Sequence, residues 1–205
     1  MKIIKILFSL LIAIVTLLPQ TAHAWSLNVY QPYSATCTQK LHGSYSAFDF
    51  QDYSGSTTYF RAGITSPYRV RGLVDSGYIS SLALYDRNGN YSHTERIFRV
   101  DVYWSQSTGT IWNRVGSVRY VHQSHTGGVS TNTWLNHGSS VCRNSTSHTG
   151  VGPWYYDTTQ TKLASTGAHL HFERYTVTPG YTTWTATLNS GIYYSNNNVL
   201  YTWHN

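Results

Sequence analysis

Beyond residue 24, no run of ten or more residues repeats its apolar side chains at the spacing of an α-helix. Tyrosine, tryptophan, threonine, valine and glycine are instead plentiful along the chain, as is typical of strands and the turns that join them. The clearest strand is 97–104, in which Phe98, Val100 and Val102 alternate with polar side chains. The sequence therefore predicts a mainly β fold.

Other segments have the same character. Four further strands are predicted, and turn signals separate them: Tyr68 to Val74, Ile79 to Tyr85, Val115 to His122 and His169 to Thr176. The stretch from Ser130 to Thr166 is rich in Ser, Thr, Asn and Gly, so we expect long loops there. Those loops have two open interpretations, the wall of a substrate cleft or ordinary irregular surface.

Residues 1–24 have the pattern of an export signal. Lys2 and Lys5 precede an apolar run from Ile6 to Leu18, and Ala22-His23-Ala24 follows as a small-x-small cleavage site. The apolar run is shorter than the roughly 20 residues that span a bilayer. We therefore expect cleavage after Ala24, a secreted or periplasmic protein, and no membrane span in the mature chain.

Length and charge bound the mature protein. Residues 25–205 suffice for one domain but are few for two, so we expect a single domain, with residues 176–205 as a candidate C-terminal extension. We also expect a monomer. Fourteen Lys and Arg oppose eight Asp and Glu, and the excess persists without the signal lysines, which favours anionic partners. The arginines are scattered and form no basic run, so we expect no nucleic-acid binding.

The two cysteines have two interpretations. An even number of cysteines in an exported chain predicts a disulfide between Cys37 and Cys142. The alternative is a nucleophilic Cys142, as in secreted cysteine peptidases, but the neighbouring residues contain no motif that would supply a base or lower its pKa.

Two histidine-containing segments point to a metal site. On a strand, His169 and His171 project from the same face, with Cα atoms roughly 6.6 Å apart. Earlier in the chain, His42 and Asp49 flank a loop-like Gly-Ser stretch. Together with one histidine of the later pair, they would form the two-histidine, one-carboxylate set with which catalytic zinc is commonly held.

These segments resemble the M23 family of lysostaphin-like metallopeptidases. The run 167–172, Gly-Ala-His-Leu-His-Phe, matches the family's terminal motif, and the run 45–49, Tyr-Ser-Ala-Phe-Asp, is similar to the aspartate segment of its LasA-type and beta-lytic branch. The resemblance implies one Zn²⁺ per chain, with His42, Asp49 and His171 as its ligands. It also implies a single antiparallel β-sheet domain of the lysostaphin-like type with long loops around the cleft.

The resemblance further implies two catalytic histidines, His169 and a middle histidine that ends an aromatic-rich strand. His122 fits the middle position because it ends the run from Val115, whereas its rival His125 falls beside the Gly127-Gly128 turn. In such a site zinc activates a water that attacks the scissile carbonyl, and the two histidines move protons or stabilise the oxyanion. Glu173, on the strand face of His171, has two interpretations, a partner that orients this histidine or an ordinary polar residue.

The resemblance also implies a substrate class. Family members typically cut peptide cross-links of bacterial peptidoglycan, many at glycine bonds, so we expect a secreted zinc endopeptidase with peptidoglycan or another peptide as substrate. The main alternative is a degenerate relative that binds the cell wall without cutting it. A cysteine peptidase that uses Cys142 is a third interpretation.

Overall fold

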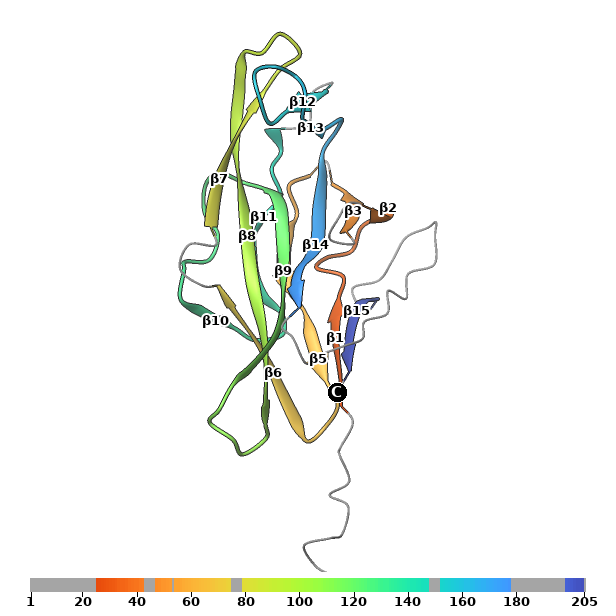
Figure 1. The fold of residues 1–205 in the computed structure, drawn as a ribbon, viewed down its shortest axis with the longest axis vertical. Coiled ribbons are helices and arrows are strands. Elements are labelled where there is room, and N and C mark those ends of the chain that lie inside the picture. Colours follow the sequence, from red (N-terminus) through yellow and green to blue (C-terminus); the bar gives the residue numbers. More distant parts are fainter. Residues whose placement is uncertain are drawn as a thin grey trace, which may run out of the picture.

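A computed structural model of the chain describes residues 25–42, 47–52, 54–74, 79–147, 152–177 and 198–204 (Figure 1). The regular elements in these ranges are all β-strands, and none of the described residues belongs to a helix long and apolar enough to cross a membrane. The strands are β1 Ser26–Tyr30, β2 Cys37–His42, β3 Ala47–Gln51, β4 Thr57–Phe60, β5 Ala62–Ile64, β6 Tyr68–Val74, β7 Ile79–Tyr85, β8 Tyr91–Gln106, β9 Asn113–Gln123, β10 Thr133–Leu135, β11 Ser139–Arg143, β12 Trp154–Tyr155, β13 Leu163–Ser165, β14 His169–Val177 and β15 Val199–His204.

One antiparallel sheet of ten strands dominates the molecule. Its main path runs β13-β12-β7-β8-β9-β14-β3-β2, and β6 and β10 extend from β8 as a branch. The 16-residue β8 pairs with β7 along its first half and with β6 along its second half. Figure 1 shows this sheet along the long axis of the molecule, with β12 and β13 near one end and β6 near the other. The expectation of a mainly β, antiparallel fold is confirmed.

The core covers one face of the large sheet. Alternate residues of β8, namely Phe98, Val100 and Val102, are fully buried there. A three-stranded sheet of order β15-β1-β5 and the pair β11-β4 supply the opposing layer. Its side chains in the core include Leu27, Phe60, Ala62, Val141, Leu200 and Trp203. Because side chains alternate along each strand, the other face of the large sheet is left for polar residues, and the candidate site lies on it.

The strands that were predicted from alternation are all present. β6 and β7 have the predicted bounds, while β8, β9 and β14 are longer than expected. The stretch 130–166 differs from the expectation of long loops, because it contains the short strands β10 to β13. β10, β11 and β12 pair with strands distant in sequence, namely β6, β4 and β7, while β13 pairs with β12. Runs of two to five residues are too short to show a period.

Near the two chain ends, the structure describes residues from 25 onward and residues 198–204. The predicted export signal, 1–24, lies outside the described residues, and Trp25, the first residue after it, is buried against Trp104 with ring centroids 5.3 Å apart. The segment 176–205 was expected as an extension. Residues 178–197 are outside the described ranges, but β15 is not an appendage: it pairs with β1 and buries Leu200 and Trp203 in the core.

The predicted disulfide is not formed in this structure. Cys37 lies on β2 at the edge of the large sheet, whereas Cys142 lies on β11 in a separate two-stranded sheet, where its Sγ donates to the Ser124 carbonyl oxygen at 3.8 Å. Burial raises the pKa of the Cys142 thiol, which disfavours the thiolate that a cysteine peptidase needs.

Candidate metal centre

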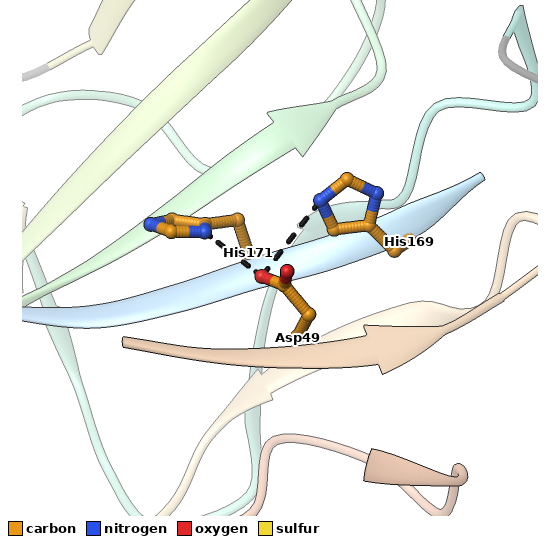
Figure 2. A group of neighbouring side chains, drawn as sticks. All are labelled: Asp49, His169 and His171. Atoms are coloured by element: carbon orange, nitrogen blue, oxygen red, sulfur yellow. Dashed lines mark hydrogen bonds and ion pairs between the residues drawn. The ribbon is translucent and has the colours of Figure 1, made fainter. Parts of the chain in front are cut away.

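The pairing of β3 with β14 assembles a group of metal-binding side chains. Asp49 lies directly opposite His171, and His169 is two residues along β14 on the same face. The ligand atoms of these three residues all lie within 4.8 Å of one another. Figure 2 shows the two imidazoles of β14 converging on the carboxylate from β3. The group could hold a metal ion.

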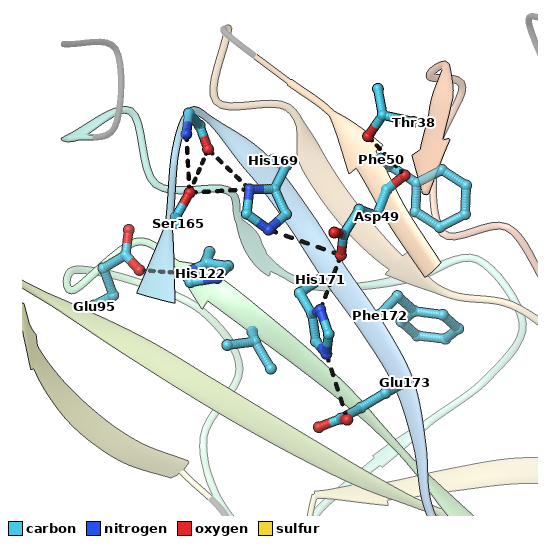
Figure 3. A network of polar contacts seen from close by, with 12 residues as sticks. Thr38, Asp49, Phe50, Glu95, His122, Ser165, His169, His171, Phe172 and Glu173 are labelled. Carbon is cyan, nitrogen blue, oxygen red and sulfur yellow. Dashed lines mark hydrogen bonds and ion pairs between the residues drawn. The ribbon is translucent and has the colours of Figure 1, made fainter. Parts of the chain in front are cut away.

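Hydrogen bonds fix the His171 ring between two carboxylates. Its Nδ1 is 2.8 Å from Asp49 Oδ1, and its Nε2 is 3.4 Å from Glu173 Oε2 (Figure 3). Glu173 is in turn ion-paired with Arg119 of β9, which lies opposite it across the sheet. Glu173 thus makes the contact expected of a partner that orients His171, which is one of the two interpretations left open by the sequence.

The two imidazoles of β14 have opposite electrostatic environments. Burial lowers the pKa of His171, but the hydrogen bonds and charges of Asp49 and Glu173 outweigh that effect and raise it to about 9. Burial and the neighbouring His122 lower the pKa of His169 to about 4. In the absence of metal, His171 therefore carries a proton that a metal must displace, whereas His169 is neutral.

The tautomer of His169 follows from its neighbours. Its Nδ1 is 2.8 Å from the Gly167 carbonyl oxygen, which can only accept a hydrogen bond. The proton of the neutral ring is therefore on Nδ1. The Nε2 lone pair is directed toward the Asp49 side of the ring, 3.8 Å from Oδ1, where it can bind a metal or accept a proton.

His122 lies beside His169, with ring centroids 4.6 Å apart. In an ideal strand it would share the core face of Tyr120. At the end of β9, however, His122 has a φ of 64°, and the β8–β9 register shifts between Arg96 and Phe98. Such irregularities redirect side chains near functional sites. Here the ring reaches both His169 and Glu95.

Glu95 of β8 anchors His122. Its Oε2 is 2.7 Å from His122 Nδ1, and the two side chains are 0% and 2% exposed, respectively (Figure 3). His93 Nε2 lies 3.5 Å from the other carboxylate oxygen of Glu95. The sequence motifs assigned no role to Glu95. Glu95 lies just before the alternating run 97–104, and nothing in the sequence around it indicates a partner 27 residues away.

The remaining predicted residues are placed as follows. The backbone of His42 pairs with Ala47 at the edge of the sheet, two residues along β3 from Asp49, and its side chain lies outside the described residues. His125 is exposed in the turn after β9 and is not a member of the group formed by Asp49, His169 and His171.

Cavities lie on both sides of the group. One of about 230 Å³ is lined by Asp49 and His169 together with Thr38 and the 166–168 turn. The other, of about 330 Å³, is lined by His171 and Glu173 and by Tyr156 and Lys162 from the loop-rich stretch. Tyr156 and Lys162 thus place part of the stretch 130–166 in the wall of the second cavity.

Comparisons with known proteins identified no family for this chain. No family model matches the sequence, and neither a curated protein nor a solved structure matches the chain. The resemblance to M23 peptidases therefore stays a prediction, carried by the motifs around His42, Asp49 and His171.

Proposed function

We propose that this chain is an exported zinc-dependent endopeptidase that cuts peptide cross-links of peptidoglycan. The observation that carries the proposal is the convergence of Asp49, His169 and His171 next to the buried His122. A carboxylate with two imidazoles is a donor set that catalytic zinc takes in proteins. The cavities on either side of the group fit a peptide that continues in both directions, as an endopeptidase requires.

Zinc at this site would supply Lewis-acid polarisation of the scissile carbonyl and lower the pKa of an attacking water. Asp49 and His171 are its ligands in the proposal. The motif resemblance gives the third position to His42 and leaves His169 to move protons, which its neutral ring and its Nε2 lone pair suit.

His122 is the second proton-handling group in the proposal. The Glu95 carboxylate can only accept a hydrogen bond, so His122 Nδ1 is the donor and Nε2 is the ring nitrogen that can take up a proton. An imidazole that takes up a proton there during the reaction would become a cation beside a buried carboxylate, which stabilises the charge. His122 and His169 together would protonate the leaving amine and stabilise the oxyanion.

The substrate class rests on the motif resemblance, the export pattern and the basic charge of the chain. Peptidoglycan is an extracytoplasmic polymer with carboxylate groups, and a basic protein is attracted to it at long range. Many M23 peptidases cut at glycine bonds, so cross-links that contain glycine are the first substrates to test.

Alanine variants of the five histidines test the assignment of roles. We expect His42→Ala and His171→Ala to lose most of the bound zinc. We expect His122→Ala and His169→Ala to keep about one zinc per chain while hydrolysis of purified peptidoglycan falls by about 10² or more. His125→Ala is the matched control, with zinc content and activity like those of the unmodified protein.

Three results would change the proposal. Loss of zinc in His169→Ala together with full zinc in His42→Ala would make Asp49, His169 and His171 the ligands. Activity in His122→Ala without activity in His125→Ala would transfer the middle role to His125. Zinc binding without hydrolysis of any peptidoglycan would favour the degenerate, wall-binding alternative.

A further inference from the structure

A second surface lies on the polar face of the large sheet, at the end that β6 forms. We call it the tryptophan cluster, and it consists of Arg69, Arg71, Tyr103, Trp112 and Trp134. Arg71 of β6 lies opposite Tyr103 of β8. On the other side of β6, Trp134 of β10 lies opposite Leu73, which shares the strand face of Arg71. Trp112 immediately precedes β9.

The members of the cluster contact one another. The Trp134 ring is 5.3 Å from Tyr103 and 5.7 Å from Trp112. The guanidinium groups of Arg69 and Arg71 lie 5.3 Å and 5.0 Å from the centroid of the Trp112 ring, as cation–π pairs do. Trp134 nevertheless remains 43% exposed. The cluster therefore presents aromatic surface and two cations to solvent.

A cavity of mixed polar and apolar lining adjoins the cluster. Arg69 Nη2 donates to the Gly109 carbonyl oxygen at 2.5 Å, and Gly109 lines a cavity of about 490 Å³ in the β8–β9 turn. Trp104 and the exposed Ile111 contribute apolar surface to this cavity, while the polar residues Gln106, Thr108, Thr110 and Asn113 line the rest. Its volume is in the range typical of ligand sites.

The cluster and the metal centre share one face of the sheet. Tyr103 pairs with Arg114 on β9, and Arg119, five residues on, pairs with Glu173, the neighbour of His171. At roughly 3.3 Å per residue, the five residues from Arg114 to Arg119 put the cluster about 17 Å from Glu173 along β9. A polymer that follows this face would reach both places.

The chemistry of the surface fits an acidic polysaccharide. Aromatic faces pack against the C–H faces of sugar rings, amide and hydroxyl side chains hydrogen-bond to sugar hydroxyls, and arginines pair with carboxylates. Single-stranded nucleic acid also stacks on aromatic rings, but it is held by a track of cations along its phosphates, and here the cluster contains two arginines.

We propose that the tryptophan cluster and its adjoining cavity form a binding site for a polysaccharide that carries carboxylate groups. The site holds the glycan while the metal centre acts on an attached peptide. That this glycan is the one in peptidoglycan rests on the proposed function. Binding at the cluster itself requires neither metal nor catalysis.

The test is equilibrium binding in the presence of a chelator, so that hydrolysis does not contribute. The probe is peptidoglycan glycan strands freed of stem peptides, whose lactyl carboxylates are then exposed. N-acetylglucosamine hexamer serves as a neutral glycan and oligothymidylate as a nucleic acid. The variants are Trp134→Ala and Arg71→Gln, and Tyr91→Ala, an exposed aromatic at the other end of β8, is the matched control.

We expect Trp134→Ala to weaken binding of the carboxylated strands by about tenfold and Tyr91→Ala to leave it unchanged. Arg71→Gln should reduce the preference for carboxylated strands over the neutral hexamer. Unchanged binding in both Trp134→Ala and Arg71→Gln, or tighter binding of oligothymidylate than of the strands, would overturn the proposal. Glycan binding by a protein that hydrolyses no peptidoglycan would support it while refuting the proposed function.

Discussion

Glu95 has no exposed side-chain surface and lies 2.7 Å from His122, which suits a residue that positions this imidazole. We expect Glu95→Gln to lower hydrolysis by about 10- to 100-fold, because an amide can still accept the hydrogen bond but no longer balances a positive ring. The pH at which activity is half-maximal on the acid side should shift as well. Zinc content should stay the same, because Glu95 is not a ligand.

A loss of activity in Glu95→Gln must be distinguished from a loss of folded protein. Unfolding in urea and zinc content identify a variant that is merely destabilised. Equal activity with the same pH profile would show that Glu95 only fills space beside His122.

His171 links metal binding to pH. Because Asp49 and Glu173 raise the pKa of His171 to about 9, a metal must displace its proton at any lower pH. We expect the affinity for zinc to fall by up to about tenfold for each pH unit below 9, measured by titration against a competing chelator. Glu173→Gln removes one of the two supporting carboxylates, so the pH below which the zinc affinity begins to fall should shift to a lower value. An affinity that does not change between pH 6 and 8 would contradict the assignment.

Individual site residues differed in how far the sequence predicted them. The His169–His171 pair could be predicted because strand alternation puts both side chains on one face, and Asp49 could be predicted from its motif. The role of Glu95 was not, since its contact depends on a bulge and on the positive φ of His122. The alternative to His122, namely His125, could be weighed from the neighbouring glycines alone.

Among the elements, the loop between β3 and β4 depends on Asp52. Its carboxylate accepts hydrogen bonds from Ser54 and Ser56 and from Asn144 at 2.6 Å, so it joins this loop to the end of β11. Burial raises the pKa of Asp52, but these hydrogen bonds outweigh it and lower the pKa. The carboxylate therefore stabilises the fold above the unfolded-state pKa of about 4, and this stabilisation is lost as pH falls through the lower folded-state value.

We expect Asp52→Ala to lower the free energy of unfolding by about 1–3 kcal/mol at pH 7, because its donors lose a charged acceptor. The difference from the unmodified protein should shrink toward pH 2, where the carboxylate is protonated. Urea unfolding at both pH values measures this. Asp86→Ala, in an exposed turn, is a control for loss of a carboxylate elsewhere. An equal difference at both pH values would show that charge does not matter at position 52.

The elements that could be predicted are those with an internal period. β6 and β7 had the predicted bounds, and the polar and apolar faces of β8 were assigned correctly over 98–102. The short strands β10 to β13 and the terminal β15 were missed because their pairing partners, rather than their own sequences, define them. The placement of Tyr156 and Lys162 beside His171 depends on those pairings and was equally out of reach.

On the scale of the whole molecule, the two faces of the large sheet have different roles. Its inner face packs against β1, β4 and β15, while its outer face carries the candidate metal centre and, further along, the tryptophan cluster. Composition was enough to predict a mainly β domain. It could not predict that both surfaces would lie on one face, because that depends on the register of β6, β8, β9 and β14.

The central claim is that metal bound next to Asp49 and His171 makes the protein a peptidoglycan hydrolase. The most direct test is to strip the protein with a chelator, return zinc in steps, and measure bound zinc and peptidoglycan hydrolysis in the same samples. The account predicts that hydrolysis is absent without zinc and rises in proportion to bound zinc up to about one ion per chain. Hydrolysis that persists in stripped protein, or zinc that binds at one per chain without any hydrolysis, would contradict it.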